Sequence, residues 1–115
     1  MKLRIRHNSI RLRLTQTEVA QLRDAGAVEE YIEFSQGHRL TYRITAQGQA
    51  LTCEYQDGNI VLAVPKPMVD AWANASQVGM ESDGPLRLVI EKDFQCLDPA
   101  HPEENVDTFP NPKAC

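Results

Sequence analysis

Two groups of residues in this 115-residue sequence could do chemistry, and the first is a pair near its end. Cys96 and His101 lie five positions apart, with Asp98, Glu103 and Glu104 close by. Thiolate, imidazole and carboxylate groups are the ligands of zinc and similar ions, and Cys and His also serve as nucleophile and base. Zinc knuckles and ribbons have a second close pair of ligands that is missing here, so a small buried hydrophobic residue is the more ordinary interpretation of Cys96. Cys96 and His101 are therefore a candidate metal site, and the sequence specifies no cofactor.

The second group is a run of basic residues at the start. Residues 1–14 contain five Lys or Arg and no acid, whereas the whole chain has a net charge of −4. Arginines that project at every second position suit phosphate or carboxylate groups. The competing interpretation is a solvated face, whose cross-strand ion pairs contribute about 0.2–1 kcal/mol each. The candidate anion-binding residues are Arg4, Arg6, Arg11 and Arg13, together with Arg43 and Glu54 farther along the chain.

These basic residues alternate with apolar ones in the segment KLRIRHNSIRLRL, and the phase of the alternation changes in the middle. A two-residue turn at the change pairs Ile5 with Ile10 and Leu3 with Leu12, which gives a hairpin with one apolar and one basic face. A single long strand with a bulge is the alternative.

A first helix is predicted directly after this segment. Thr15 is a suitable N-cap, Glu18 completes a capping box, and Gly26 provides the C-terminal stop. Val19 and Leu22 form its apolar stripe.

A second helix is predicted for KPMVDAWANAS, residues 66–76. Pro67 suits the first helical position. Its buried stripe is expected to contain Met68, Trp72 and Ala75.

Between the helices, residues 28–65 predict a meander of four antiparallel strands. Turns at Gln47-Gly48 and Asp57-Gly58, and a loop around Gly37, keep one apolar face in register. The expected pairs are Phe34 with Leu40, Ile32 with Tyr42, Ile44 with Leu51, Tyr42 with Cys53, Tyr55 with Ile60, and Cys53 with Leu62.

A last strand, LRLVIEKDF, follows with Leu86, Leu88 and Ile90 facing inward. The fold class is therefore α+β: a twisted, mainly antiparallel sheet in the order ββαββββαβ, with two helices on one face. The sheet either stays open or curls towards a partial barrel. Residues 1–95 form a single domain, and 96–115 form an acidic, proline-rich tail that is docked or flexible. No internal repeat is apparent.

Composition excludes several classes of protein. The net negative charge argues against general binding to nucleic acid. No apolar run reaches the ~18 residues of a membrane span, and the N-terminus lacks the apolar core of a signal peptide. Three cysteines without CxxC spacing indicate reduced thiols and a cytoplasmic location.

The opening MKLRIRHNSIRLRLTQTEV and the closing EKDFQCL with FPNP resemble a family of small bacterial proteins known only as a domain of unknown function. The resemblance spans nearly the whole chain. It implies a stand-alone bacterial cytoplasmic protein and supplies no functional residues.

Three functional hypotheses follow. The first is a non-catalytic binding or interaction protein that self-associates or binds a protein partner. The second is an enzyme or sensor for a small anionic ligand that uses the Arg/Glu face, and the third is the metal site. The tail either lies as an extended strap on the basic hairpin, with Leu97, Val106 and Phe109 as anchors, or recruits a partner through FPNP.

Overall fold

A computed structural model describes residues 1–93, which form eight strands and two α-helices in the order ββαββββαββ. The first half contains β1 (Lys2–Arg6), β2 (Ser9–Leu14), α1 (Gln16–Ala25), β3 (Ala27–Glu33), a short 3-10 turn η1 (Ser35–Gly37) and β4 (Arg39–Ala46). The second half contains β5 (Thr52–Gln56), β6 (Asn59–Val64), α2 (Lys66–Asn74), β7 (Gly79–Asp83) and β8 (Arg87–Lys92). The predicted α+β class is confirmed, and β7 is a strand that the sequence analysis did not predict.

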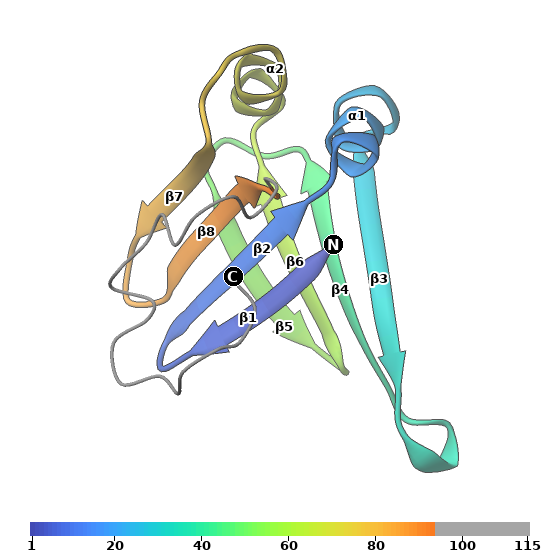
Figure 1. The fold of residues 1–115 in the computed structure, drawn as a ribbon. Coiled ribbons are helices and arrows are strands. Elements are labelled where there is room, and N and C mark those ends of the chain that lie inside the picture. Colours follow the sequence, from blue (N-terminus) through green and yellow to red (C-terminus); the bar gives the residue numbers. More distant parts are fainter. Residues whose placement is uncertain (94–115) are drawn as a thin grey trace, which may run out of the picture.

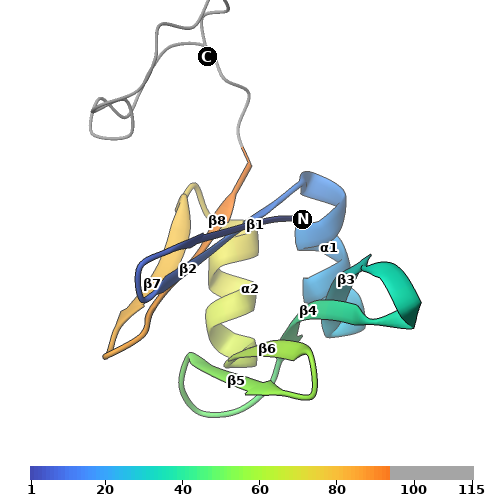
Figure 2. The same ribbon diagram turned by 90° about the horizontal axis from the view of Figure 1, so that it is seen from below.

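The strands form two four-stranded sheets rather than one. Sheet A has the order β1-β2-β8-β7, and sheet B has the order β3-β4-β6-β5. The sheets pack face to face with both helices at the same end (Figure 1), and a view from below shows the helices over the space between the sheets (Figure 2). The sheets do not close into a barrel. No helix within residues 1–93 is long and apolar enough to cross a membrane.

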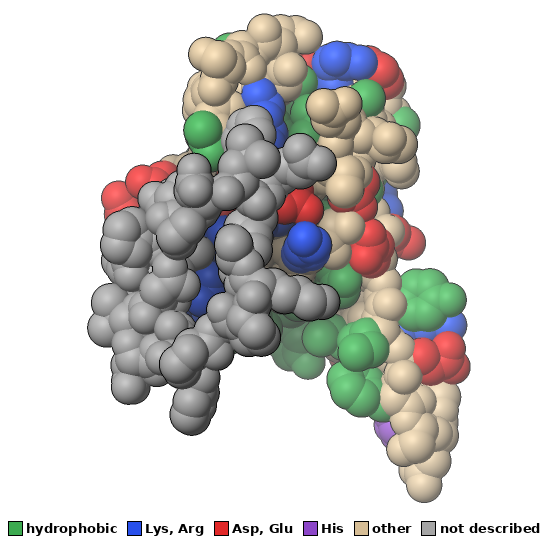
Figure 3. All heavy atoms as spheres, in the orientation of Figure 1, with side chains coloured by type: hydrophobic (Ala, Val, Ile, Leu, Met, Phe, Trp, Pro, Cys, Tyr) green, Lys and Arg blue, Asp and Glu red, His purple; other side chains and the backbone are tan. Residues whose placement is uncertain are grey.

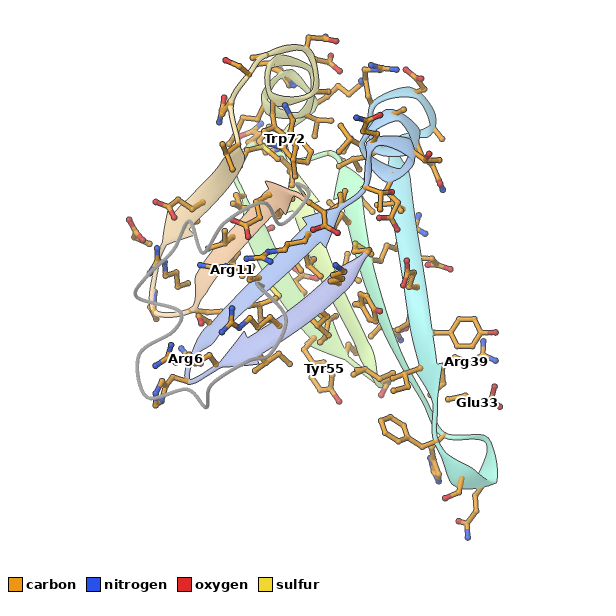
Figure 4. The ribbon with its side chains drawn as sticks, in the orientation of Figure 1. Arg6, Arg11, Glu33, Arg39, Tyr55 and Trp72 are labelled. Carbon is orange, nitrogen blue, oxygen red and sulfur yellow. The ribbon has the colours of Figure 1, made fainter. Side chains whose placement is uncertain are left out.

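The core fills the space between the sheets below the helices. Trp72 of α2 is fully buried, and its indole Nε1 donates a hydrogen bond to the carbonyl of Val78 at 3.1 Å. Figure 4 shows Trp72 beneath α2, directed towards the sheets. The largest side chains that are almost completely buried are Trp72, Leu12, Leu14, Leu22, Ile44, Leu62, Ile90, Val64 and Val69.

The first hairpin and α1 form as their sequences predict. In β1 and β2, Leu3 lies opposite Leu12 and Ile5 opposite Ile10, so the hairpin, not a single bulged strand, is present. The capping box of Thr15 and Glu18 is complete, and Gly26 ends α1 with φ 85°. A left-handed φ of this size is one that glycine adopts without a Cβ penalty.

The two halves of the described chain are repeats of one ββαββ unit. Adding 50 to the residue numbers of the β1–β2 register gives the β5–β6 register, as Arg6↔Ser9 becomes Gln56↔Asn59. Similarly, adding 46 to a residue of β4 gives its counterpart in β8, so that Thr41↔Asn59 corresponds to Arg87↔Ser9. The repeat was not apparent in the sequence.

Each sheet combines a hairpin from one half with a hairpin from the other. The junctions are parallel pairs, β2 with β8 in sheet A and β4 with β6 in sheet B. Equivalent hydrogen bonds support both junctions: the amide of Arg87 donates to the carbonyl of Asn8 at 3.0 Å, and the amide of Thr41 donates to that of Gly58 at 2.8 Å. Neither half therefore completes a sheet by itself.

The predicted meander is wrong at one connection. Pairing across Asp57-Gly58 is confirmed, because Tyr55 lies opposite Ile60 and Cys53 opposite Leu62. The predicted pairing across Gln47-Gly48 is absent from the described residues, because β5 lies on the far side of β6 and β4 pairs with β6 in parallel. Apolar residues in phase define which face of a strand is buried, but they do not define its neighbour.

Two smaller predictions also need correction. Ile32 lies opposite Leu40 instead of Tyr42, because β3 ends at Glu33 and η1 extends the connection, which leaves Phe34 outside the strand. In α2 the buried residues are Val69 and Trp72, whereas Met68 is partly exposed and Ala75 lies beyond the last helical residue.

The contact between Gly58 and β4 offers a test of this topology. A Cβ at Gly58 would lie 2.8 Å from the carbonyl oxygen of Arg39, whereas a Cβ at Gly37 would meet nothing within 4 Å; both glycines have a left-handed φ, 80° and 75°. We expect Gly58→Ala to lower the free energy of unfolding by about 1–3 kcal/mol more than Gly37→Ala, because backbone cannot yield as a flexible side chain does. Equal losses in denaturant unfolding of the two variants would contradict the β4–β6 pairing.

Candidate functional site

A basic pocket lies on the outer face of sheet A, away from the core. Its volume is about 230 Å³, and Figure 4 shows two of its arginines, Arg6 and Arg11, on the hairpin side of that sheet. The lining residues come from β1, β2 and β8: Arg4, Arg6, Ser9, Ile10, Arg11, Arg87 and Val89. We call these residues the basic pocket.

Strand register explains why the arginines meet. Arg4 lies directly opposite Arg11 across β1 and β2, and Arg11 lies opposite Val89 of β8. In the next row, Arg6 is opposite Ser9, which is opposite Arg87. Like charges on opposed residues repel one another, and a nearby anionic group, from the protein or from a ligand, offsets that repulsion.

Among residues 1–93, acidic side chains flank the basic pocket without lining it. Arg87 makes an ion pair with Glu81 of β7 at 3.2 Å, in which both side chains are about half exposed. Glu91 makes ion pairs with Arg13 at 2.7 Å and with Arg11 at 3.8 Å. An exposed ion pair such as that of Arg87 with Glu81 contributes only about 0–1 kcal/mol to stability. An incoming anion could therefore replace Glu81 as the partner of Arg87.

The turn between β1 and β2 fixes the lower wall of the basic pocket. The Ser9 hydroxyl donates a hydrogen bond to the carbonyl of Arg6 at 2.6 Å, and the side-chain amide of Asn8 donates to the carbonyl of Pro85 at 2.5 Å. Since Pro85 precedes β8, the second bond ties the turn to the strand that carries Arg87. The backbone around the arginines is therefore held from both sides.

The equivalent positions in sheet B carry no such cluster. The counterparts of Arg4, Arg6, Arg11 and Arg87 are Glu54, Gln56, Val61 and Thr41. Sheet B has the same strand arrangement with these residues in place. The fold thus does not require arginine at any of the four positions.

The candidate anion-binding residues fall into three places. Arg4, Arg6 and Arg11 line the basic pocket, and Arg13 lies one row away beside Glu91. Arg43 and Glu54 lie on the outer face of sheet B, where Arg43 pairs with Glu29 at 3.0 Å, so they do not join the arginines of sheet A. Arg87 was missed, because only the parallel pairing of β2 with β8 brings it beside Ser9.

Residues 1–93 contain neither a candidate metal site nor a reactive cysteine. Cys96 and His101 lie outside the described residues. Within them, no three His, Cys, Asp or Glu residues are grouped so that they could hold a metal ion. Burial raises the pKa of the Cys53 thiol, and the nearby Glu54 carboxylate adds to the effect, so this thiol is protonated at neutral pH and a poor nucleophile.

A second charged cluster surrounds the amino group of Met1. The amine is buried and makes ion pairs with Glu18 at 2.5 Å and Glu30 at 2.6 Å. The Tyr42 hydroxyl donates to Glu30 at 3.2 Å. This cluster links the start of β1 to α1, β3 and β4, and so it connects the edge of sheet A to sheet B.

The same contacts shift two pKa values. Burial alone would lower the pKa of the amine, but hydrogen bonds and charges of Glu18 and Glu30 outweigh it and raise the pKa above its ordinary value of 8.0. For Glu18, burial acts to raise the pKa, and the bonds to the amine and to the Thr15 amide outweigh it and lower the pKa below 4.5.

Sequence comparison now places this two-sheet α+β protein in a family. Residues 1–113 match the family described as "Family of unknown function (DUF7009)", and the chain belongs to it. The expected membership of a family of unknown function is thereby confirmed. Searches of curated proteins and of solved structures each found no match.

The pKa shifts predict how stability depends on pH. The amine stabilises the fold fully below pH 8.0 and ceases to do so as the pH rises through its raised pKa; Glu18 stabilises it above pH 4.5 and ceases to do so as the pH falls through its lowered pKa. We expect Glu18→Gln to remove the charge pair while it retains the capping box, and to cost about 1.5 kcal/mol or more near pH 6.5.

Thermal unfolding from pH 4 to pH 10 tests this expectation. The control is Asp24→Asn, which breaks the exposed pair with Arg23 and should leave the melting temperature unchanged. A Glu18→Gln profile parallel to that of the unaltered protein above pH 8 would show that the amine and Glu18 are not coupled.

Proposed function

We propose that the protein is a non-catalytic binding module whose basic pocket takes a phosphate or carboxylate group of a small ligand. The single observation that carries this proposal is the convergence of four arginines from three strands on a pocket with no acid among its described lining residues. Arginine suits this task because its planar guanidinium donates two parallel hydrogen bonds to such groups.

The comparison of the two sheets supports a functional origin of the cluster. If the arginines served only stability or solubility, neutral residues would suffice, as Gln56, Val61 and Thr41 do at the equivalent places in sheet B. Sheet A instead has arginine at both Arg4 and Arg11, which lie opposite each other and repel one another, so that a nearby negative group is favourable there. This contrast between the sheets supports a role of the arginines in binding an anion rather than in stabilising the fold.

The chemistry of the pocket supports binding without catalysis. Among its described lining residues, Ser9 has the single hydroxyl, and that hydroxyl is hydrogen-bonded to the carbonyl of Arg6. Those lining residues include no carboxylate, imidazole or thiol to act as a general base. The volume of about 230 Å³ suits one charged group with its immediate neighbours, since pockets for drug-sized ligands start at about 300 Å³.

Exchange of the arginines for their counterparts in sheet B gives a sharp test. We expect the triple variant Arg6→Gln, Arg11→Val, Arg87→Thr to fold and to bind pyrophosphate at least about tenfold more weakly than the unaltered protein, because it loses three charge-assisted donors. The measurement is a titration followed by amide chemical shifts, which should change at positions 4–11 and 87–89. The matched control is Arg43→Val. Position 43 in sheet B is the counterpart of Val89, so this variant removes an arginine outside the basic pocket and should bind normally.

Unchanged pyrophosphate affinity in the triple variant would overturn the proposal. So would shifts spread evenly over both sheets, since these would indicate general attraction of anions to basic surface.

A second candidate function is self-association through the end of the molecule opposite the helices. Ile5 and Tyr55, counterparts in the repeat, are 59% and 69% exposed there, and Ile32 and Phe34 are about half exposed at the end of β3. Figure 3 shows hydrophobic side chains gathered at this end. An exposed apolar cluster of this kind is typical of an interaction surface.

For this second candidate we expect a dimer that Ile5→Ser with Tyr55→Ser converts to a monomer, because the variant removes the two apolar counterparts. Sedimentation equilibrium at several protein concentrations measures it. The control is Val78→Ser, which removes an apolar side chain that is about half exposed at the helical end. A monomer at all concentrations before any substitution would exclude this function.

A further inference from the structure

We infer that the acidic tail of this chain is an intramolecular ligand of the basic pocket and competes there with an external anion. The inference deepens the proposed function, because it takes over from it the capacity of the pocket to bind anions.

The described end of the chain already makes an acid–base contact on the basic face. After β8, the amide of Asp93 donates to the carbonyl of Leu14 at 2.8 Å, and its carboxylate makes an ion pair with Lys2 at 3.1 Å. Lys2 belongs to the same face of β1 as Arg4 and Arg6, since alternate residues of a strand share a face. The last described residue therefore lies beside the basic outer face of sheet A.

Distance and charge match along the next residues. Arg4 is two residues beyond Lys2 on β1, about 7 Å along the strand, and Asp98 is five residues beyond Asp93, a reach of up to about 17 Å. Residues 94–115 contain four acids, Asp98, Glu103, Glu104 and Asp107, against one lysine. Carboxylates are among the groups that the arginines of the basic pocket suit.

The composition of the tail favours an extended occupant. Residues 94–115 include four prolines, and proline-rich chains favour an extended backbone that loses little entropy on binding. A ligand tethered next to its site acts at a millimolar effective concentration. A free anion must therefore displace the tail. Its apparent affinity for the basic pocket is lower than its affinity for a pocket without the tail.

The repeat shows that only sheet A has this arrangement. The counterparts of Asp93 and Lys2 are Gln47 and Thr52, which have no charge. At that place the chain enters β5 and continues in sheet B. The acidic residue that follows β8 and the basic face therefore lie on the same sheet.

The first experiment locates the tail directly. A spin label is attached in the full chain at Thr108→Cys, with Cys53, Cys96 and Cys115 each changed to Ala. We expect it to broaden the amide signals of Arg6, Arg11 and Arg87 more than those of Glu54, Gln56 and Thr41, their counterparts in sheet B. Neutralising the tail with Asp98→Asn, Glu103→Gln, Glu104→Gln and Asp107→Asn should abolish the difference. Equal broadening of the two sheets, or a difference that survives neutralisation, would overturn the inference.

The second experiment measures competition with the same neutralised tail but all cysteines intact. We expect it to bind pyrophosphate at least about fivefold more tightly than the unaltered chain. If the label reports docking but neither protein binds pyrophosphate, the tail is the occupant of the basic pocket and the external-ligand function fails. If pyrophosphate binds equally well to both and no docking is seen, the function holds and this inference fails.

Amide hydrogen exchange of residues 94–115 in the unaltered protein guards against effects of the cysteine substitutions. Protection should decrease as salt is raised from 20 mM to 500 mM, about the range over which screening of exposed charges becomes strong. Protection that ignores salt but disappears with a chelator would overturn the inference and favour the metal site at Cys96 and His101.

Discussion

The parallel pairing of strands from different halves is the constraint on which the rest of this structure depends. β2 with β8 and β4 with β6 are the junctions that make two sheets out of four hairpins. Each ββαββ unit contributes one hairpin to each sheet, so the core between the sheets forms only when both units are present. Ile44 and Ile90, which are counterparts and fully buried, lie at the two junctions opposite Leu62 and Leu12. Stability and connectivity are therefore inseparable in this fold.

The candidate site follows from the same constraint. Arg6 and Arg11 come from the N-terminal hairpin and Arg87 comes from the last strand, and nothing but the β2–β8 junction brings them together. Because the junction is parallel, the start of β8 lies beside the start of β2, next to the turn that Asn8 ties to Pro85. A change that loosened this junction would disperse the arginines as well as unfold the sheet edge. Binding at the basic pocket should thus report on the integrity of both halves.

Local features of the sequence predicted local structure well. Alternation and a phase change predicted the register of Leu3 with Leu12, and the pattern of Thr15, Glu18 and Gly26 predicted both ends of α1. The pairing of β5 with β6 was predicted, but the second neighbour of β4 could not be, because the apolar residues of β5 and of β6 are equally in phase with those of β4. The repeat escaped notice because the counterparts agree mainly at buried positions, such as Ile10 with Ile60 and Leu12 with Leu62, and differ on the outer faces. Arg87 escaped notice for a related reason: its role depends on a pairing partner 78 positions earlier, Ser9.

This division between buried and outer positions explains how one fold can hold a site on one sheet only. Buried positions must match in both halves because they pack in a common core, where changes of volume are costly. Outer positions face water and are free to diverge, and they have done so: Arg4 corresponds to Glu54 and Asp93 to Gln47. Sheet B continues from β4 through a short connection into β5, whereas the last described residue after β8, Asp93, makes an ion pair with Lys2 on the basic face of sheet A. The sheet that carries the arginines is thus also the sheet beside which the described chain ends, and the residues that follow in the sequence are rich in acids. If the basic pocket binds anions as proposed, an acidic segment of the same chain is therefore the first group that can compete for it.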